Sequence, residues 1–404
     1  MSLRIGIIRE GKIPPDSRVA LTPVQCAAIV KDNPQIEIFA QPSPGRCFAD
    51  EEYDRRGIPL QEDISHCDIL LGVKEVPVTQ LLPNKTYFFF SHTIKKQSHN
   101  RALLQAIIEK NIQLVDYEVL TNEQGKRVIA FGKFAGMVGA HNGILTYGQR
   151  TGLFELKRMK DCLDYAEAKM LYKEMTWPPM RVVLTGTGRV GQGAALVLRD
   201  MGVKEVDPED YLANTYDEAV FTQLRCRHYA ARKDGQAFDK HHFYTHPEDF
   251  KSIFEPYAHS SDVMINGIYW DSNAPAFFTK AEMKDKAFNI QVIADVTCDI
   301  APVSSIPSTL KASTIAEPVF GYDPHTDQET AAYQESAVDM MTIDNLPNEL
   351  PRDASNAFGG QFIKHVIPEL LTPESDFIKR ATVATNGQLG PNFTYLQNYI
   401  NGLE

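Results

Sequence analysis

"MRVVLTGTGRVGQGAALVLRDMG", residues 180–202, combines a strand, a turn and a helix pattern in that order. An apolar run over 182–184 is typical of a buried strand, and an amphipathic pattern follows glycines 186, 188 and 191. In this context the spacing G-x-G-x-x-G predicts a turn that binds the pyrophosphate of a dinucleotide. Gly186 would make the tight bend, Gly188 would admit the pyrophosphate and Gly191 would let the helix pack on the strand. The alternative is a strand–helix turn that uses glycines without binding a ligand. The residues expected to bind the cofactor are Gly186, Thr187, Gly188, Arg189, Val190 and Gly191.

In such folds an acidic side chain about 20 residues further on binds the ribose. Asp207 in "GVKEVDPED" (202–210) has this position and favours a cofactor with a free 2′-hydroxyl. A 2′-phosphate would need cations instead, and four follow in the same region: Arg225, Arg227, Arg232 and Lys233. A solvated basic loop explains these four cations equally well. The choice between NAD and NADP therefore stays open.

Short apolar runs alternate with helical patterns along the rest of the chain. The runs of the first part are "RIGIIR" (4–9), "IEIFAQ" (36–41), "CDILLGV" (67–73), "TYFFFS" (86–91) and "IQLVDYE" (112–118). A second series begins at the glycine turn and continues through 261–270 and 290–299. Alternation of this kind predicts parallel, doubly wound sheets. We expect an α/β fold with two Rossmann-like domains and an active-site cleft between them.

The region between the two series indicates where the domains meet. Small and apolar residues at helical spacing over 134–154 predict a long helix crossing between domains, and the helical tail is expected to pack back on the first domain. The expected organisation is a discontinuous substrate domain, 1–135 plus about 335–404, and a dinucleotide-binding domain, about 136–334, with a polar insertion near 212–255.

Composition restricts the class of partner. The chain has 404 residues, 43% of them apolar and 23% charged, and a net charge of -11. Nucleic acids and anionic membranes attract clustered positive charge, so we expect small-molecule substrates and neither of these partners. The six cysteines form no CxxC pair, which argues against a disulfide framework or a structural zinc site. No apolar run reaches the roughly 18 residues of a membrane span and no signal pattern opens the chain, so the expected location is the cytoplasm.

Ionisable side chains follow the predicted strands of the first series. Ligands of open parallel sheets bind at the carboxyl ends of the strands. This rule places together, in a crevice facing the glycine turn, Arg9, Lys12, Arg18, Lys74, His92 and Glu118. A lysine and a histidine in such a crevice can exchange protons with an amine or carbinolamine if burial and positive neighbours lower the lysine pKa. Arginine and lysine beside them would bind substrate carboxylates. For His92 alone, a structural role is the competing interpretation.

A second group of histidines, His241, His242 and His246, lies in "HHFYTHPEDF" (241–250). Neither cysteines nor a helical HExxH pattern accompany it, so we expect no metal site there.

Six stretches together carry a resemblance to a known family that covers nearly the whole chain. They resemble the lysine-ketoglutarate reductase half of α-aminoadipic semialdehyde synthase and, less closely, the lysine-forming saccharopine dehydrogenases, within the alanine dehydrogenase and transhydrogenase alpha-subunit superfamily. The last stretch discriminates best, because alanine dehydrogenases lack it. The stretches are "QEDISHCDILLGVKEVP" (61–77), "KTYFFFSHTIKKQ" (85–97), "VDYEVLTNEQGKRVIAFGKFAG" (115–136), "LTGTGRVGQGA" (184–194), "INGIYWDSNAP" (265–275) and "TIDNLPNELPRDASNAFG" (342–359).

The resemblance implies an NAD(P)(H)-dependent oxidoreductase. It would condense the side-chain amine of lysine reductively with 2-oxoglutarate to saccharopine, or catalyse the reverse oxidation. Lys74 and His92 would transfer protons, and Glu75 would tune the lysine. Asp344 would lie near the nicotinamide. The residues that would hold substrate carboxylates and amines are Arg18, Lys95, Glu118 and Arg127.

Two further functions stay open. One is an alanine-dehydrogenase-like reaction on a smaller amino acid, and the other is a catalytically silent nucleotide-binding protein like a transhydrogenase alpha subunit. The sequence ends at Glu404, before any region like the glutamate-forming half of the bifunctional synthase. We therefore expect a separate enzyme to consume saccharopine. Monomer and homodimer are both compatible with the sequence.

Overall fold

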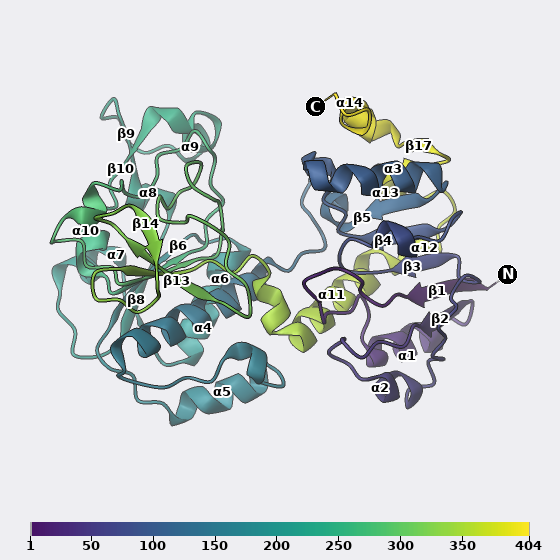
Figure 1. The fold of residues 1–404 in the computed structure, drawn as a ribbon, viewed down its shortest axis with the longest axis horizontal. Coiled ribbons are helices and arrows are strands. Elements are labelled where there is room, and N and C mark those ends of the chain that lie inside the picture. Colours follow the sequence, from purple (N-terminus) through teal and green to yellow (C-terminus); the bar gives the residue numbers. More distant parts are fainter. Residues whose placement is uncertain (1, 404) are drawn as a thin grey trace. The chain divides into compact units, whose positions relative to one another are not determined.

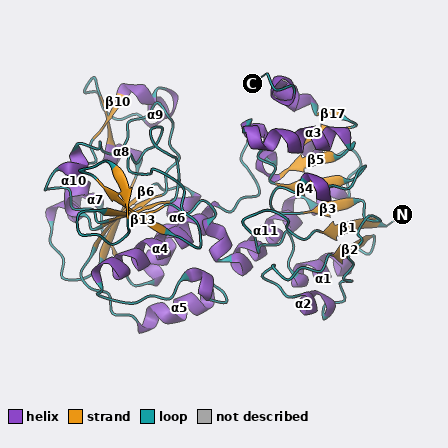
Figure 2. Ribbon diagram, viewed as in Figure 1, coloured by secondary structure: helices purple, strands orange, loops and turns teal. Residues whose placement is uncertain are grey.

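The computed structural model describes residues 2–403 and divides into two compact units. Unit 1 contains the chain up to Phe131 and from Pro351 onward, and unit 2 contains Gly132–Leu350 (Figure 1). Each unit has an inner layer of strands with helices outside it (Figure 2). The predicted α/β class with two parallel-sheet units is confirmed. Within residues 2–403, no helix has both the length and the apolar character needed to cross a membrane.

The return to unit 1 comes later than the expected residue 335. Strand β15 (Val338–Met341) pairs with β12 and β13 of the unit 2 sheet, so the chain returns only at Pro351. The first crossing lies at Phe131/Gly132, close to the expected residue 135.

Unit 1 contains a seven-stranded sheet in the order β17-β16-β5-β4-β3-β1-β2. The strands β5, β4, β3, β1 and β2 are parallel, and the last two strands of the chain run antiparallel at the β5 edge. The strands are β1 (Leu3–Ile7), β2 (Ile36–Ala40), β3 (Ile69–Leu71), β4 (Thr86–Phe89), β5 (Gln113–Asp116), β16 (Thr382–Thr385) and β17 (Gln388–Leu389).

Both faces of this sheet are buried, as continuous apolar strands predict. Because side chains alternate along a strand, Phe88 packs in one core cluster while Tyr87 and Phe89 pack in the other. The first cluster includes residues of α1 and α11, and the second includes residues of α3. The helices of unit 1 are α1 (Pro23–Asp32), α2 (Asp50–Asp54), α3 (Arg101–Glu109), α11 (Pro351–His365), α12 (Ile367–Leu370), α13 (Asp376–Ala381) and α14 (Gln397–Ile400).

Unit 2 contains an eight-stranded sheet in the order β14-β13-β15-β12-β11-β6-β8-β7. The strands from β15 to β7 in this order are parallel, and β13 and β14 add an antiparallel edge. Besides β15, they are β6 (Arg181–Thr185), β7 (Lys204–Glu205), β8 (Val220–Leu224), β11 (Val263–Asn266), β12 (Val292–Asp295), β13 (Val319–Asp323) and β14 (Gln328–Thr330).

The helices of unit 2 are dominated by the predicted long helix, α4. Glycines let it approach its neighbours, since a Cβ at Gly136 would collide with the carbonyl oxygen of Val190 on α6. The helices are α4 (Gly132–Thr151), α5 (Tyr165–Glu174), α6 (Arg189–Asp200), α7 (Pro208–Ala213), α8 (Cys226–Tyr229), α9 (Lys240–Thr245) and α10 (Glu255–Ser260).

Only part of the expected insertion near 212–255 lies outside the main sheet of unit 2. Strand β8 lies inside that range yet pairs with β6 at the centre of the sheet. The excursion itself follows β8 and consists of α8, α9 and a hairpin of β9 (Ala230–Arg232) and β10 (Phe250–Ser252). The local pattern missed β8 because its short apolar run stands between charged segments.

Candidate active site

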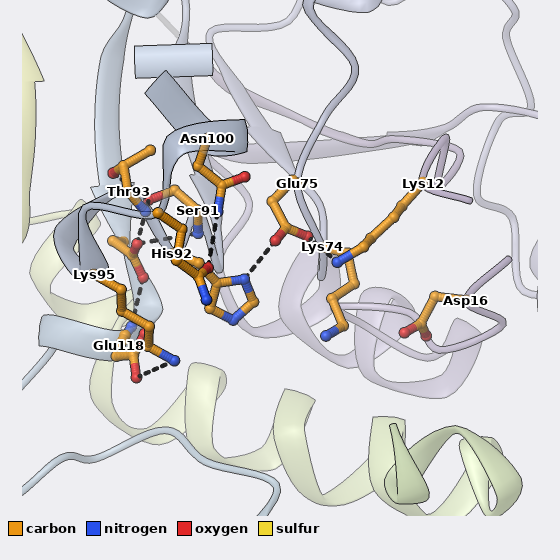
Figure 3. A network of polar contacts seen from close by, with 12 residues as sticks. Lys12, Asp16, Lys74, Glu75, Ser91, His92, Thr93, Lys95, Asn100 and Glu118 are labelled. Carbon is orange, nitrogen blue, oxygen red and sulfur yellow. Dashed lines mark hydrogen bonds and ion pairs between the residues drawn. The ribbon is translucent and has the colours of Figure 1, made fainter. Parts of the chain in front are cut away.

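The carboxyl edge of the unit 1 sheet carries the predicted polar cluster. Lys74 follows β3, His92 follows β4 and Glu118 follows β5. These strands are neighbours in the sheet, and the loop after β1 adds Lys12 and Arg18. Figure 3 shows Glu75 lying between His92 and Lys12, with Lys74 beside it.

Glu75 links two of these groups. Its Oε1 lies 2.5 Å from Nδ1 of His92, and its Oε2 accepts a hydrogen bond of 2.8 Å from Nζ of Lys12. Burial opposes ionisation of Glu75, but these hydrogen bonds prevail and lower its pKa to about 2. An ionised Glu75 fixes the imidazole through Nδ1 and leaves Nε2 for proton transfer.

Lys74 is half-buried and has a lowered pKa. Burial is the main cause, and the positive charges of Arg18 and Lys12 add to it. Its backbone is held by Glu10, whose carboxylate accepts hydrogen bonds from the N–H groups of Val73 (2.6 Å) and Lys74 (2.9 Å). Burial raises the pKa of Glu10 to about 7. The environment thus favours the neutral amine that a proton acceptor requires.

Arg18 is only 2% exposed and makes a bidentate pair with Asp16. Nε lies 2.9 Å from Oδ1, Nη2 lies 2.6 Å from Oδ2, and the guanidinium lies 4.3 Å from the ring centroid of Phe131. Because the pair is fully desolvated, Arg18 supplies its charge from a fixed position.

The two carboxylate oxygens of Glu118 have different surroundings. Oε1 accepts a hydrogen bond from Arg127 (2.8 Å) and lies 3.4 Å from Nζ of Lys95. Oε2 is buried and has no hydrogen-bond partner among the described residues. A buried acceptor without a donor is costly, so this oxygen is suited to a substrate ammonium.

The glycine turn of unit 2 has the geometry that the fingerprint requires. Gly186 has a φ of +95°, Gly188 is the N-cap of α6, and a Cβ at Gly191 would collide with the carbonyl oxygen of Gly186. A Cβ at Gly188 would meet nothing within 4 Å. The turn therefore leaves open backbone at the N-terminus of a helix, the kind of position at which dinucleotide-binding folds bind a pyrophosphate.

A cavity of about 680 Å³ opens beside this turn. Three cations line it, Arg225, Arg227 and Lys240, and none of them pairs with a carboxylate among the described residues. Arg227 donates a hydrogen bond to His228, and Lys240 lies 6.0 Å from the ring centroid of Tyr244. Cations without carboxylate partners beside an open glycine turn are suited to a phosphate group. The other lining residues are Gly186, Thr187, Gly188, Gln192, Cys226, Tyr229, Phe238, Tyr244, Gly267, Ile268 and Tyr269.

The strand order places Asp207 after the edge strand of the sheet and not beside the glycine turn. The neighbour of β6 is β8 and not β7, so the position expected of the ribose-binding group is Arg225, directly after β8. Asp207 follows the edge strand β7 and precedes α7, and it is absent from the lining of the cavity. Among the other predicted cations, Arg232 pairs with Asp234 and Lys233 donates to the carbonyl of Glu248.

Three other residues expected to bind the cofactor are not among those that line the cavity. Arg189 and Val190 are the first residues of α6 and are absent from the cavity lining, and Val190 packs against Gly132 and Gly267. Asp344 is exposed and follows β15, at the same carboxyl edge of the sheet as the glycine turn.

The histidines of 241–246 lie on and just after α9. His242 pairs with Asp249 at 2.7 Å, and His246 lies 3.6 Å from Glu248. Within residues 2–403, no group of three or more His, Cys, Asp or Glu is placed to hold a metal ion.

Sequence reasoning missed three buried or half-buried acids of the unit 1 cluster: Glu10, Asp16 and Asp116. Glu10 directly follows a predicted strand, which is the signal that identified Lys74 and His92, whereas Asp16 lies further along the same loop and Asp116 lies inside the predicted run 112–118. The sequence does not show which residues they contact. For Glu10 and Asp116 these partners are distant in sequence and become neighbours only in the folded chain.

Comparison with known proteins agrees with this geometry. The fold is that of L-alanine dehydrogenase, with a TM-score of 0.67 over 100% of both chains at 14% sequence identity. Residues 6–138 match the family model "Alanine dehydrogenase/PNT, N-terminal domain". The two units therefore have the fold of L-alanine dehydrogenase, and the predicted fold is confirmed.

Two relatives with named activities resemble this chain more closely in sequence. The alpha-aminoadipic semialdehyde synthase of Mus musculus is 29% identical over 95% of this chain and 46% of its own length. The saccharopine dehydrogenase [NAD(+), L-lysine-forming] of Emericella nidulans is 26% identical over 89% of both chains. The chain thus spans about half of the synthase and nearly all of the fungal dehydrogenase. The predicted resemblance to these dehydrogenases is confirmed.

Replacing Gly188 tests the nucleotide site. Gly188→Val is expected to abolish NADH and NADPH binding because the side chain would occupy the space of the pyrophosphate, while the melting temperature stays close to that of the unaltered protein. Calorimetric titration and thermal unfolding measure the two effects. Gly45→Val, at another position where a Cβ meets nothing within 4 Å, is the matched control. Unchanged nucleotide affinity in Gly188→Val would show that the turn binds no dinucleotide.

Proposed function

We propose that the protein catalyses the reductive condensation of lysine and 2-oxoglutarate to saccharopine, or the reverse oxidation, with a nicotinamide dinucleotide bound by unit 2. In the forward direction the side-chain amine of lysine attacks the keto carbon, water leaves, and the resulting C=N double bond is reduced to a C–N single bond. The cofactor supplies the hydride. Unit 1 supplies the proton transfers and the binding of both substrates.

The observation that carries this proposal is the Lys74–Glu75–His92 arrangement. Condensation needs a group that removes a proton from the attacking amine and another that protonates the departing oxygen. The lowered pKa of Lys74 favours its neutral amine, and Glu75 leaves Nε2 of His92 for the second role. Which of the two acts on which atom depends on the direction of the reaction.

The charges of the cluster suit two amino-acid-like substrates. The keto acid and the lysine head group bring three carboxylates in all, for which Lys95, Arg127 and the buried Arg18 offer cations. The unpaired Oε2 of Glu118 can accept a hydrogen bond from an ammonium group. A substrate as small as alanine needs fewer of these anchors, which favours the larger pair.

The relatives support the same reaction. The fungal enzyme named as a lysine-forming saccharopine dehydrogenase aligns over 89% of both chains. The similarity to alanine dehydrogenase supports only the assignment of the fold, because the sequence identity is 14%.

The test is a panel of amino acids and keto acids with NADH and NADPH, followed by nicotinamide absorbance. Oxidation of the cofactor is expected to require lysine and 2-oxoglutarate together, because each fills part of the anchor set. Pyruvate with ammonia, and ornithine with 2-oxoglutarate, are the controls and should be slower. Equal rates with pyruvate and ammonia would assign the protein to alanine dehydrogenase chemistry. Absence of turnover with every pair would favour a silent nucleotide-binding protein.

For the cofactor, we propose a preference for NADP(H). The group after β8 is Arg225 and not an acid, and Arg227 and Lys240 line the same cavity. A 2′-phosphate could accept hydrogen bonds from these cations, whereas the ribose hydroxyls of NAD have no carboxylate partner at this position.

Charge removal tests this preference. Hydrogen bonds to charged groups contribute about 1.5–3 kcal/mol, so Arg225→Gln or Arg227→Gln should weaken NADPH binding by roughly 10- to 100-fold and leave NADH binding nearly unchanged. Arg232→Gln is the matched control, because its guanidinium pairs with Asp234 and does not line the cavity. Equal losses for both cofactors, or no loss for NADPH, would refute the preference.

A further inference from the structure

We propose that Asp116 is a positioning residue for His92. Its buried carboxylate joins the loop after β4 to the loop after β5 and so holds the imidazole in place for proton transfer. The inference rests on the proposed function, in which His92 transfers protons.

The geometry starts from two neighbouring strand ends. Asp116 is the last residue of β5, is 0% exposed and stands opposite Phe89 of β4. Oδ2 accepts hydrogen bonds from the backbone N–H (3.0 Å) and the hydroxyl (2.5 Å) of Ser91. Oδ1 accepts a hydrogen bond of 2.7 Å from the N–H of Glu118. One carboxylate thus holds the loops that carry both His92 and Glu118.

Ser91 extends this hold across His92. Its Oγ lies 2.8 Å from the hydroxyl oxygen of Thr93 and accepts a hydrogen bond of 3.2 Å from the Thr93 N–H. Both Ser91 and Thr93 are 0% exposed. The residues before and after His92 are therefore tied to each other and, through Asp116, to β5.

His92 needs such a hold because its backbone is left-handed, with a φ of +52°. This conformation costs a residue other than glycine of the order of 1 kcal/mol, and it persists only when the surrounding structure enforces it. With the backbone fixed and the Phe90 ring stacked at 6.4 Å, the imidazole points at Glu75. Without the hold, the backbone can relax and carry Nδ1 away from Glu75.

Two variants weaken the hydrogen bonds of Asp116 to different degrees. Asp116→Asn keeps the size of the side chain but exchanges one acceptor oxygen for an NH₂ group, which faces an N–H donor and repels it. Ser91→Ala removes only the hydroxyl and leaves the backbone hydrogen bond to Asp116. Ser375→Ala is the matched control, since Ser375 is a buried serine of unit 1 whose Oγ accepts a backbone N–H at the start of α13.

The first readout does not depend on turnover. With ¹⁵N-labelled histidine, the ring signals of His92 are identified by their loss in His92→Gln among the 11 histidines. In Asp116→Asn and in Ser91→Ala these signals are expected to shift or broaden as the bond to Glu75 weakens, and in Ser375→Ala they should not. Unchanged His92 signals in folded Asp116→Asn and Ser91→Ala would overturn the proposal. If Asp116→Asn does not fold, Ser91→Ala decides alone.

The second readout is a double-mutant cycle on lysine and 2-oxoglutarate. Small misplacements of a catalytic group lower rates by as much as about 100-fold, so Asp116→Asn and Ser91→Ala should each lower kcat by roughly 10- to 100-fold with little change in KM for the nucleotide. Neither should lower kcat further when combined with His92→Gln. Fully multiplicative losses would overturn the proposal. Failure of the unaltered protein to use these substrates would instead refute the proposed function, and the histidine signals would still decide the role of Asp116.

Discussion

The convergence of parallel strand ends is the constraint on which the candidate site depends. In unit 1 the order β5-β4-β3-β1 brings four loops to one edge, and Glu118, His92, Lys74 and Lys12 come from these loops. The sheet is buried on both faces, against two different core clusters. A shift of one residue in the pairing of any strand would move each of its side chains to the opposite face of the sheet. The same packing that stabilises the sheet therefore fixes where the ionisable groups lie.

Burial and charge then give these groups their chemistry. Cations lie close to Lys74, and burial disfavours its charge, so its amine loses a proton more readily than a solvated lysine. Glu75 remains ionised because His92 and Lys12 bind it. The cluster thus combines a weakened base with an oriented histidine, a combination that suits the transfer of protons to and from an amine.

The features that the sequence predicted are those set by local patterns. The glycine turn follows from a strand, three glycines and a helix within one short stretch, and Lys74 and His92 follow from their positions after apolar runs. The placement of Arg225 was not predictable in this way, because the pairing of β8 with β6 is a choice between distant segments. Asp116 resembles any polar residue at a strand end until its partners, Ser91 and Glu118, are seen.

We propose that Lys74 takes part in the chemistry of the site and not only in folding. The most direct measurement is the turnover of lysine and 2-oxoglutarate by Lys74→Met, with Lys31→Met, an exposed lysine of α1, as the control. Lys74→Met is expected to lower kcat by about 10²- to 10⁴-fold, with unchanged nucleotide binding and melting temperature. A kcat within a few-fold of that of Lys31→Met would show that Lys74 has no part in the chemistry.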